Sequence, residues 1–363
     1  MGLLRVALAL AVFLSHLPLA TVHFVGGGVA VQGFFIVSGF YMSLVLGGKY
    51  ADTTLFYSNR ALRIFPGYAV MMVVAALALF GLAASATASP DMFVTLWHRT
   101  SSTAVLAFEN LALLGQELLF WFTVAPDGGL VFDPTNAGPT PEAPVAWQFL
   151  LVPQAWSLSI ELTFYALAPY LARRSTRTLV LIGLASVALR LAGHWLPVSY
   201  ALWQGRLFPT ALFLFIAGML SQRALPLAAR LPRWVGWIAN AALLAVVIAL
   251  PLVALKGETD RWILYATIAL AAPFVFHAFG RFSIDRFIGD LSYPIYLTHL
   301  LVIGLVLTYE PEHGAWVALA GTVCLSLLLL LAVDHPVDRW RQARLKAAQT
   351  RPIGIEPAVA TVG

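Results

Sequence analysis

Apolar stretches of about 20 residues recur along this chain, and they limit its possible folds more than any other feature. A helix of about 20 apolar residues spans the hydrocarbon core of a bilayer. The chain has 363 residues, of which 60% are hydrophobic and only 11% charged, unlike soluble domains. The stretches leave no room for a separate soluble domain. The sequence therefore predicts an all-α, polytopic transmembrane helical bundle.

The expected organisation is one membrane domain at residues 1–340 and a short, disordered cytoplasmic tail at 341–363. The segment 103–125 is a possible additional span, but its glutamate and amide side chains suit a re-entrant or interfacial helix better. Residues 53–65 are expected to form a separate amphipathic helix on the cytoplasmic surface. The sequence thus predicts ten spans, near residues 3–23, 26–46, 66–86, 150–172, 178–197, 205–222, 234–255, 262–280, 290–309 and 315–333.

Basic residues indicate how the bundle is oriented. They cluster in alternate connections, whereas the other connections are neutral or acidic, and 126–146 contains no lysine or arginine. The positive-inside rule places the basic clusters in the cytoplasm, so both termini are expected there. Because the net charge of +5 sits in short loops, it reflects topology, and we expect no nucleic-acid partner. The single cysteine, Cys324, lies within the last span and excludes an internal disulfide.

The first span carries two ionisable residues, Arg5 and His16. They are eleven positions apart, or about 16 Å along a helix, which puts His16 past the middle of the hydrocarbon. An ionisable side chain at that depth costs several kcal/mol unless it faces a polar cavity. We therefore interpret His16 as a functional candidate, with a hydrogen bond to a neighbouring helix as the structural alternative.

Other polar residues fall near the same depth. Ser157, Glu161 and Tyr165 share one helix face, and His299 lies about nine residues into its span. Two imidazoles and a carboxylate that converge in a dry site can hold a tautomer and pass a proton. No two of these groups are one turn apart on a helix, so the spacing predicts no metal site.

Two further segments are candidates for binding. Arg60 and Arg63 share one helix face and form a forked pair of donors suited to phosphate, although ordinary anchoring at the membrane surface is equally consistent. The glycines and Ser38 of residues 33–40 offer close helix approach and a hydroxyl at membrane depth, a pattern that helix packing alone also explains.

Five motifs stand in one order along the chain. Arg5 and His16 are followed by GFFIVSGF at 33–40, RALR at 60–63, WSLSIELTFYALAP at 156–169 and SYPIYLTH at 292–299. This pattern resembles the acyltransferase-3 family, bacterial integral-membrane O-acyltransferases that modify surface or secreted glycans. The resemblance covers residues 5 to about 335, and it implies about ten spans, cytoplasmic termini and a place in the bacterial inner membrane.

The resemblance also implies an activity, the transfer of an acyl group, most often acetyl, from cytoplasmic acyl-CoA to a hydroxyl of a polysaccharide or its lipid-linked precursor. The implied partners are acyl-CoA, the glycan or lipid-linked sugar, membrane lipid and polysaccharide-synthesis machinery, with no permanently bound cofactor. A polysaccharide or lipid-linked sugar transporter is the alternative, but the inverted repeats typical of transporters are not visible in the sequence.

Each candidate residue takes a role under this resemblance. His16 is the expected base, either deprotonating the acceptor hydroxyl or taking the acyl group itself, and Glu161 or His299 orients its ring or relays the proton. The other residues divide between the two substrates. The donor is expected to contact Arg5, Arg60, Arg63, Phe34, Phe35 and Ser38, and the acceptor to contact Trp156, Ser157, Tyr165 and Tyr293.

Overall fold

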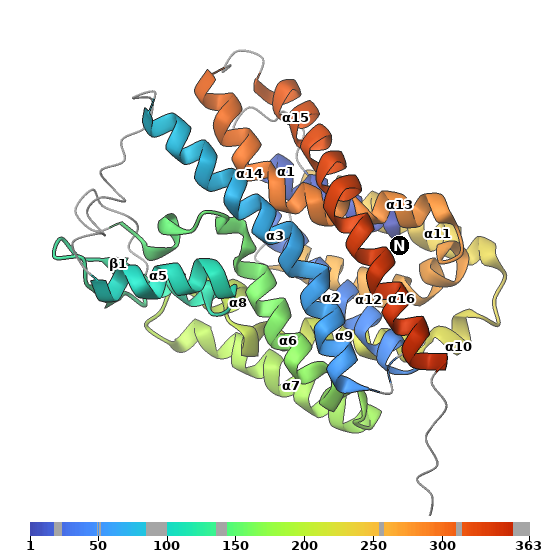
Figure 1. The fold of residues 1–363 in the computed structure, drawn as a ribbon. Coiled ribbons are helices and arrows are strands. Elements are labelled where there is room, and N and C mark those ends of the chain that lie inside the picture. The colour runs from blue at the N-terminus through green and yellow to red at the C-terminus, as the bar shows by residue number, and fades with distance from the viewer. Residues whose placement is uncertain are drawn as a thin grey trace, which may run out of the picture.

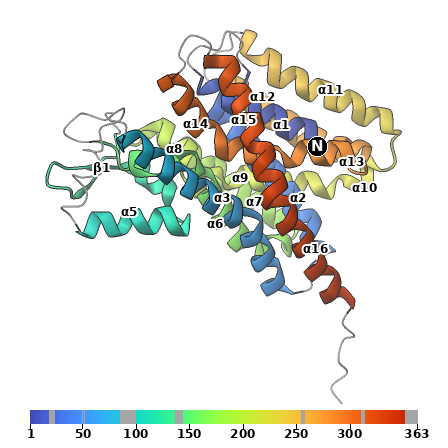
Figure 2. The same cartoon turned by 45° about the horizontal axis from the view of Figure 1, so that its top comes forward.

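The computed structural model describes residues 1–17, 24–48, 50, 52–84, 100–135, 144–253, 258–309 and 314–350. The chain forms one bundle of helices, with a small outer segment beside it (Figures 1 and 2). The α-helices are α1 Gly2–Ser15, α2 Gly27–Leu46, α3 Thr53–Ala84, α5 Thr100–Ala112, α6 Trp156–Ala172, α7 Thr176–Ala192, α8 Tyr200–Arg206, α9 Phe208–Arg223, α10 Leu225–Ala228, α11 Arg233–Ala249, α12 Thr259–Phe279, α13 Ser283–Asp290, α14 Ser292–Tyr309, α15 Gly314–Leu329 and α16 His335–Thr350.

The bundle confirms the prediction of an all-α membrane protein. Within the described residues, seven helical segments are long and apolar enough to cross a bilayer, and the bent pair α8 and α9 provides an eighth. Helices α1 and α6 have 14 and 17 residues and fall short of the length needed for an untilted span. Large apolar side chains such as Val73, Leu77 and Phe80 are exposed, as expected for a surface that faces lipid. The count of ten spans stays a prediction.

Three predicted boundaries were wrong. The first helix, expected over 3–23, ends at Ser15, and 18–23 lie outside the described residues. The helix expected at 53–65 is not separate, because α3 runs through Pro66 as one helix of 32 residues; membrane helices tolerate an internal proline that a soluble helix would not.

The tail predicted as disordered from residue 341 is instead helical to Thr350. A π-helical turn, Leu330–Asp334, joins α15 to α16, and α16 packs against α3 (Figure 1). The Arg344 side chain donates to Ser58 Oγ at 3.1 Å and to Asn59 Oδ1 at 3.4 Å on α3. Strong helix formers in this stretch and its docking on α3 explain the order.

Helix α2 occupies the centre of the bundle and packs closely on α9. A Cβ added at Gly39 would lie 1.9 Å from the carbonyl oxygen of Phe215, and one at Gly218 would lie 1.9 Å from that of Ile36. Such distances are sterically impossible, so the two backbones are in direct contact only because both positions are glycine. The interpretation of the 33–40 motif as a packing element therefore holds for Gly39.

The segment 103–125 forms no single helix long enough to cross a membrane. It consists of α5, a 3₁₀ turn at Gln116–Trp121 and the strand β1 Phe122–Val124, which pairs antiparallel with β2 Leu130–Phe132. These elements lie at one side of the bundle (Figure 1). Further 3₁₀ turns occur at Ala146–Phe149, Pro153–Ala155, Gly193–Trp195 and Leu250–Leu252.

We expect the stability of this outer segment to depend on pH because of two glutamates. Burial and the nearby Glu117 carboxylate raise the pKa of Glu109 to about 7. A carboxyl group whose pKa is raised in the folded state stabilises it below the pKa of the unfolded chain, and this stabilisation is lost as the pH rises through the folded value. The protection factors for hydrogen exchange in residues 100–124 are therefore expected to fall between pH 5 and 8, and less so in Glu109→Gln. Equal pH dependence in both proteins would contradict this assignment.

Helices α8 and α9 meet at a bend of 43°, and buried side chains satisfy the carbonyl groups at the break. The Gln204 carbonyl accepts hydrogen bonds from Arg190 Nη1 at 2.6 Å and from Gln32 Nε2 at 3.2 Å. The Thr210 hydroxyl donates to the Trp203 carbonyl at 2.6 Å. Arg190 is fully buried, and this role explains a buried arginine for which the sequence offers no acidic partner.

Candidate active site

A cavity of about 480 Å³ lies among α1, α2, α3, α6, α13, α14 and α16. Ten of the thirteen residues predicted for the site line it, although they come from five separate segments of the chain. They are Arg5, Phe34, Phe35, Ser38, Arg60, Arg63, Ser157, Glu161, Tyr165 and Tyr293. The N-terminal end of α1 and helix α16 both line this cavity, as expected if the two termini lie on the same side of the membrane.

Arginines gather at one end of this cavity. Arg5 and Arg63 both approach Asp290, at 3.8 and 3.9 Å, so that one carboxylate is shared between two guanidinium groups. Arg60 lies 5.9 Å from the ring centre of Phe56 and 5.9 Å from that of Tyr165. These distances are typical of cation–π contacts, which hold a guanidinium group without neutralising it.

Glu161 occupies the cavity wall next to the motif of α2. Its Oε1 accepts hydrogen bonds from the Ser38 hydroxyl at 2.6 Å and from the Tyr165 hydroxyl at 2.5 Å. Two hydroxyl donors stabilise a partly buried carboxylate. The structure thus brings together three predicted residues from two helices, and it places Glu161 with hydroxyl groups instead of the imidazoles.

The two predicted histidines lie beside each other outside the cavity lining. The ring centres of His16 and His299 are 5.2 Å apart; His299 is fully buried and His16 is exposed at the end of α1. In each ring Nδ1 lies 2.8 Å from a backbone carbonyl, that of Val12 for His16 and that of Tyr296 for His299. A carbonyl only accepts, so each Nδ1 carries a proton, and Nε2 is the nitrogen that can act as a base.

Tyr296 connects the histidines to the cavity. It lines the cavity, its hydroxyl lies 2.6 Å from Ser157 Oγ, and its ring centre is 5.8 Å from that of His299. Its hydroxyl also bonds to the Gln154 carbonyl. Within the described residues, His299 Nε2 is buried without a hydrogen-bond partner. Ser157, Tyr296, His299 and His16 are thus neighbouring side chains between the cavity and the exposed imidazole. A hydrogen bond joins the first two, and ring contacts join the rest.

Sequence reasoning missed several residues near the site. Tyr296 stands in the SYPIYLTH motif but received no role. Arg206 lies 3.5 Å from the ring centre of Phe120 and 4.2 Å from that of Trp156, so Trp156 contacts this arginine and does not line the cavity. Arg341 does line it. Neither arginine stood out in the sequence, because Arg206 lies at the edge of the span predicted at 205–222 and Arg341 lies in a polar stretch beyond the last predicted span.

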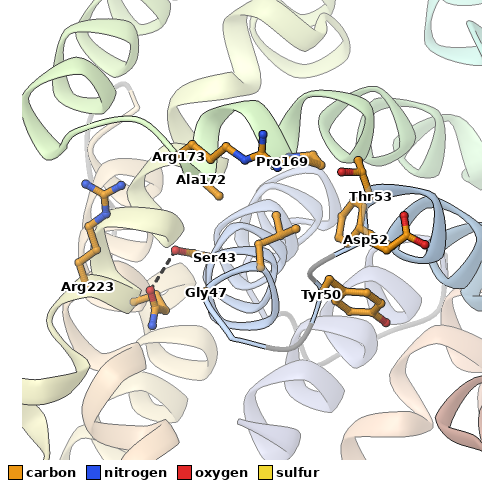
Figure 3. Close-up of a pocket in the computed structure, with 12 residues that line it drawn as sticks. Ser43, Gly47, Tyr50, Asp52, Thr53, Pro169, Ala172, Arg173 and Arg223 are labelled. Carbon is orange, nitrogen blue, oxygen red and sulfur yellow. Dashed lines mark hydrogen bonds between the residues drawn. The ribbon is translucent and has the colours of Figure 1, made fainter. Parts of the chain in front are cut away.

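A second, smaller cavity of about 230 Å³ lies where α2, α6 and α9 end and α3 begins (Figure 3). Its polar groups already bind one another. Ser43 donates to Gln222 at 2.9 Å, and Arg223 donates to Thr176 at 2.7 Å and to the Arg174 carbonyl at 2.6 Å. None of the predicted site residues lines it, so we place no chemistry there.

Comparison with known proteins agrees with this geometry. Residues 1–334 match the family described as acyltransferase domain. The chain is 28% identical over 338 residues to the exopolysaccharide production protein ExoZ of Rhizobium meliloti (strain 1021), covering 89% of this chain and 93% of that protein. No solved structure matches. The chain is thus a multi-pass membrane enzyme that transfers acyl groups, and it belongs to the acyltransferase-3 family.

Proposed function

We propose that this enzyme moves an acetyl group from cytoplasmic acyl-CoA to a hydroxyl of an exopolysaccharide or its lipid-linked precursor, in the bacterial inner membrane. One observation carries the proposal: a cavity lined by Arg5, Arg60 and Arg63 is connected through Tyr296 to the imidazoles of His299 and His16, and within the described residues His299 Nε2 has no hydrogen-bond partner. The name of the ExoZ relative supports the choice of acceptor. Anionic phosphates suit the arginine end, and general bases suit the other.

The residues divide the reaction between them. Arg5, Arg60 and Arg63 bind the phosphates of the donor, and Phe34 and Phe35 line the path of its acyl arm. His16 Nε2 accepts the proton of the acceptor hydroxyl while the oxygen attacks the thioester carbonyl. The carbon–sulfur bond then breaks, and the CoA thiolate takes the proton from the imidazolium.

The neighbouring groups hold this arrangement in place. The Val12 carbonyl fixes the tautomer of His16 through Nδ1, as the carboxylate does in other catalytic histidine pairs. His299 is the other ring of the pair, with its ring centre 5.2 Å from that of His16, and it is the second base available for the proton. Ser157 and Tyr165 line the cavity near Glu161 and contact the acceptor together with Tyr293. Trp156 lies outside the lining, against Arg206, and takes no part in this contact. Acyl transfer through an acyl-imidazole on His16 uses the same groups in two steps.

A transfer assay tests the function. Purified protein in detergent is given radiolabelled acetyl-CoA and the glycan from a strain that lacks this gene, and the glycan is analysed by mass spectrometry. We expect the label on a sugar hydroxyl, with one CoA thiol released per acetyl group transferred. Label that stays on the donor, while sealed vesicles containing the protein take up the sugar, would instead support a transporter.

A further inference from the structure

Helix α16 places one more arginine in the donor cavity. Arg341 lines the cavity and is 7% exposed. The family match ends at residue 334, one residue before α16 begins. The side chain therefore belongs to an element that neither the motifs nor the family match assigns to the site.

Arg341 shares its cavity with Arg60 and Arg63, and part of its guanidinium group has no protein partner within the described residues. Its Nη1 donates to Asp338 at 2.9 Å, but that carboxylate is 43% exposed at the rim, and Nε has no hydrogen-bond partner within the described residues. Like charges gathered in a partly enclosed site are costly unless an anion joins them.

Three acidic residues of the cavity have partners other than Arg341, whereas Asp334 Oδ2 has no hydrogen-bond partner within the described residues. Glu161 accepts from two hydroxyl groups, and Asp285 accepts from the backbone N–H groups of Gly2 at 2.9 Å and Leu3 at 3.1 Å. Asp290 is shared at long distance by two arginines, and the charge of Asp334 acts on Arg63 more strongly than on Arg341. Three guanidinium groups, with five N–H donors each, thus keep donors for an anionic ligand.

Hydrogen bonds between α16 and α3 also fix the position of Arg341 relative to Arg60 and Arg63. The bonds from Arg344 to Ser58 and Asn59 tie α16 to α3 immediately before the arginine pair. The three guanidinium groups consequently form a fixed set instead of one that assembles on a mobile tail, and a fixed set loses little entropy on binding.

We propose that Arg341 binds the phosphates of CoA together with Arg5, Arg60 and Arg63, and that it distinguishes CoA from the single-phosphate phosphopantetheine arm of an acyl carrier protein. The inference rests on the proposed function and adds to it a residue that recognises the nucleotide part of the donor. The diphosphate and the separate ribose phosphate of CoA supply charge for several guanidinium groups, whereas phosphopantetheine supplies one phosphate.

The test compares Arg341→Ala with Arg339→Ala, an exposed arginine on the same helix. A charge-assisted hydrogen bond predicts a KM for acetyl-CoA that rises about 10- to 100-fold in Arg341→Ala, with kcat nearly unchanged and partial recovery in Arg341→Lys. The KM for acetyl-phosphopantetheine should change much less. The double variant Arg60→Ala, Arg63→Ala serves as the reference for loss of donor binding.

Measurements of CoA binding distinguish a failure of this inference from a failure of the proposed function. CoA should raise the melting temperature of the unmodified protein, and less so that of Arg341→Ala, whose melting temperature without CoA should match that of Arg339→Ala. Equal KM values and equal CoA shifts in these two variants would overturn the inference while the proposed function stands. If the unmodified protein transfers no acetyl group, the proposed function fails, and the CoA shift still decides whether Arg341 binds phosphate.

Discussion

Replacing His16 by alanine is expected to lower acetyl transfer by about 10²- to 10⁴-fold, the usual contribution of a general base. The variant removes the only exposed imidazole of the His16–His299 pair and leaves the cavity lining intact, because His16 does not line it. KM for acetyl-CoA should therefore stay close to that of the unmodified enzyme. Initial rates with radiolabelled acetyl-CoA and purified glycan measure both quantities.

His194→Ala is the matched control, because His194 is also exposed. Among the described aromatic rings it contacts only Tyr200 and its chain neighbour Trp195. It should keep full activity. Incubation with acetyl-CoA in the absence of acceptor, followed by mass spectrometry of the peptide containing residue 16, distinguishes the two mechanisms: a gain of one acetyl group indicates the acyl-imidazole route. Full activity of His16→Ala would remove this residue from the chemistry.

Gly39→Ala is expected to destabilise the bundle by at least the 1–3 kcal/mol typical of overpacking. Its Cβ would collide with the backbone of Phe215, and a backbone cannot move aside as the end of a flexible side chain can. The central helix α2 and α9 would have to separate, which would also widen the donor cavity. Thermal unfolding in detergent, followed by size-exclusion chromatography, measures the loss.

Gly28→Ala on the same helix provides the comparison, because nothing lies within 4 Å of the place that an added Cβ would occupy there. Its melting temperature should equal that of the unmodified protein or exceed it slightly, since alanine favours helix over glycine. An equal effect of the two substitutions would mean that the α2–α9 contact contributes little.

The sequence predicts the cavity lining far better than the arrangement around the imidazoles. Arg60, Arg63 and Ser38 stand in motifs whose helical spacing fixes which side chains share a face. Glu161 and His299 were expected to meet because their depth in the membrane is similar. Depth along a helix is one coordinate only; the direction in which each helix faces depends on packing contacts such as the one at Gly39, which no local pattern reveals.

The other errors of the sequence-based prediction have the same physical cause. Arg341 follows the last apolar stretch, where a run of charged residues is usually solvated, and only the docking of α16 on α3 buries it. The boundary at Pro66 was wrong because proline commonly begins or ends a helix in water. Inside a bilayer the helix continues, since breaking it would expose backbone groups to hydrocarbon.

The junction of α8 and α9 has one consequence for turnover. The carbonyl group of Gln204 accepts from buried donors on two other helices, Arg190 on α7 and Gln32 on α2, and that of Trp203 accepts from Thr210. Straightening this elbow would strand an ionised side chain in a dry interior, a heavy penalty. We therefore expect this elbow to stay bent during turnover and to keep Arg206 against the rings of Phe120 and Trp156.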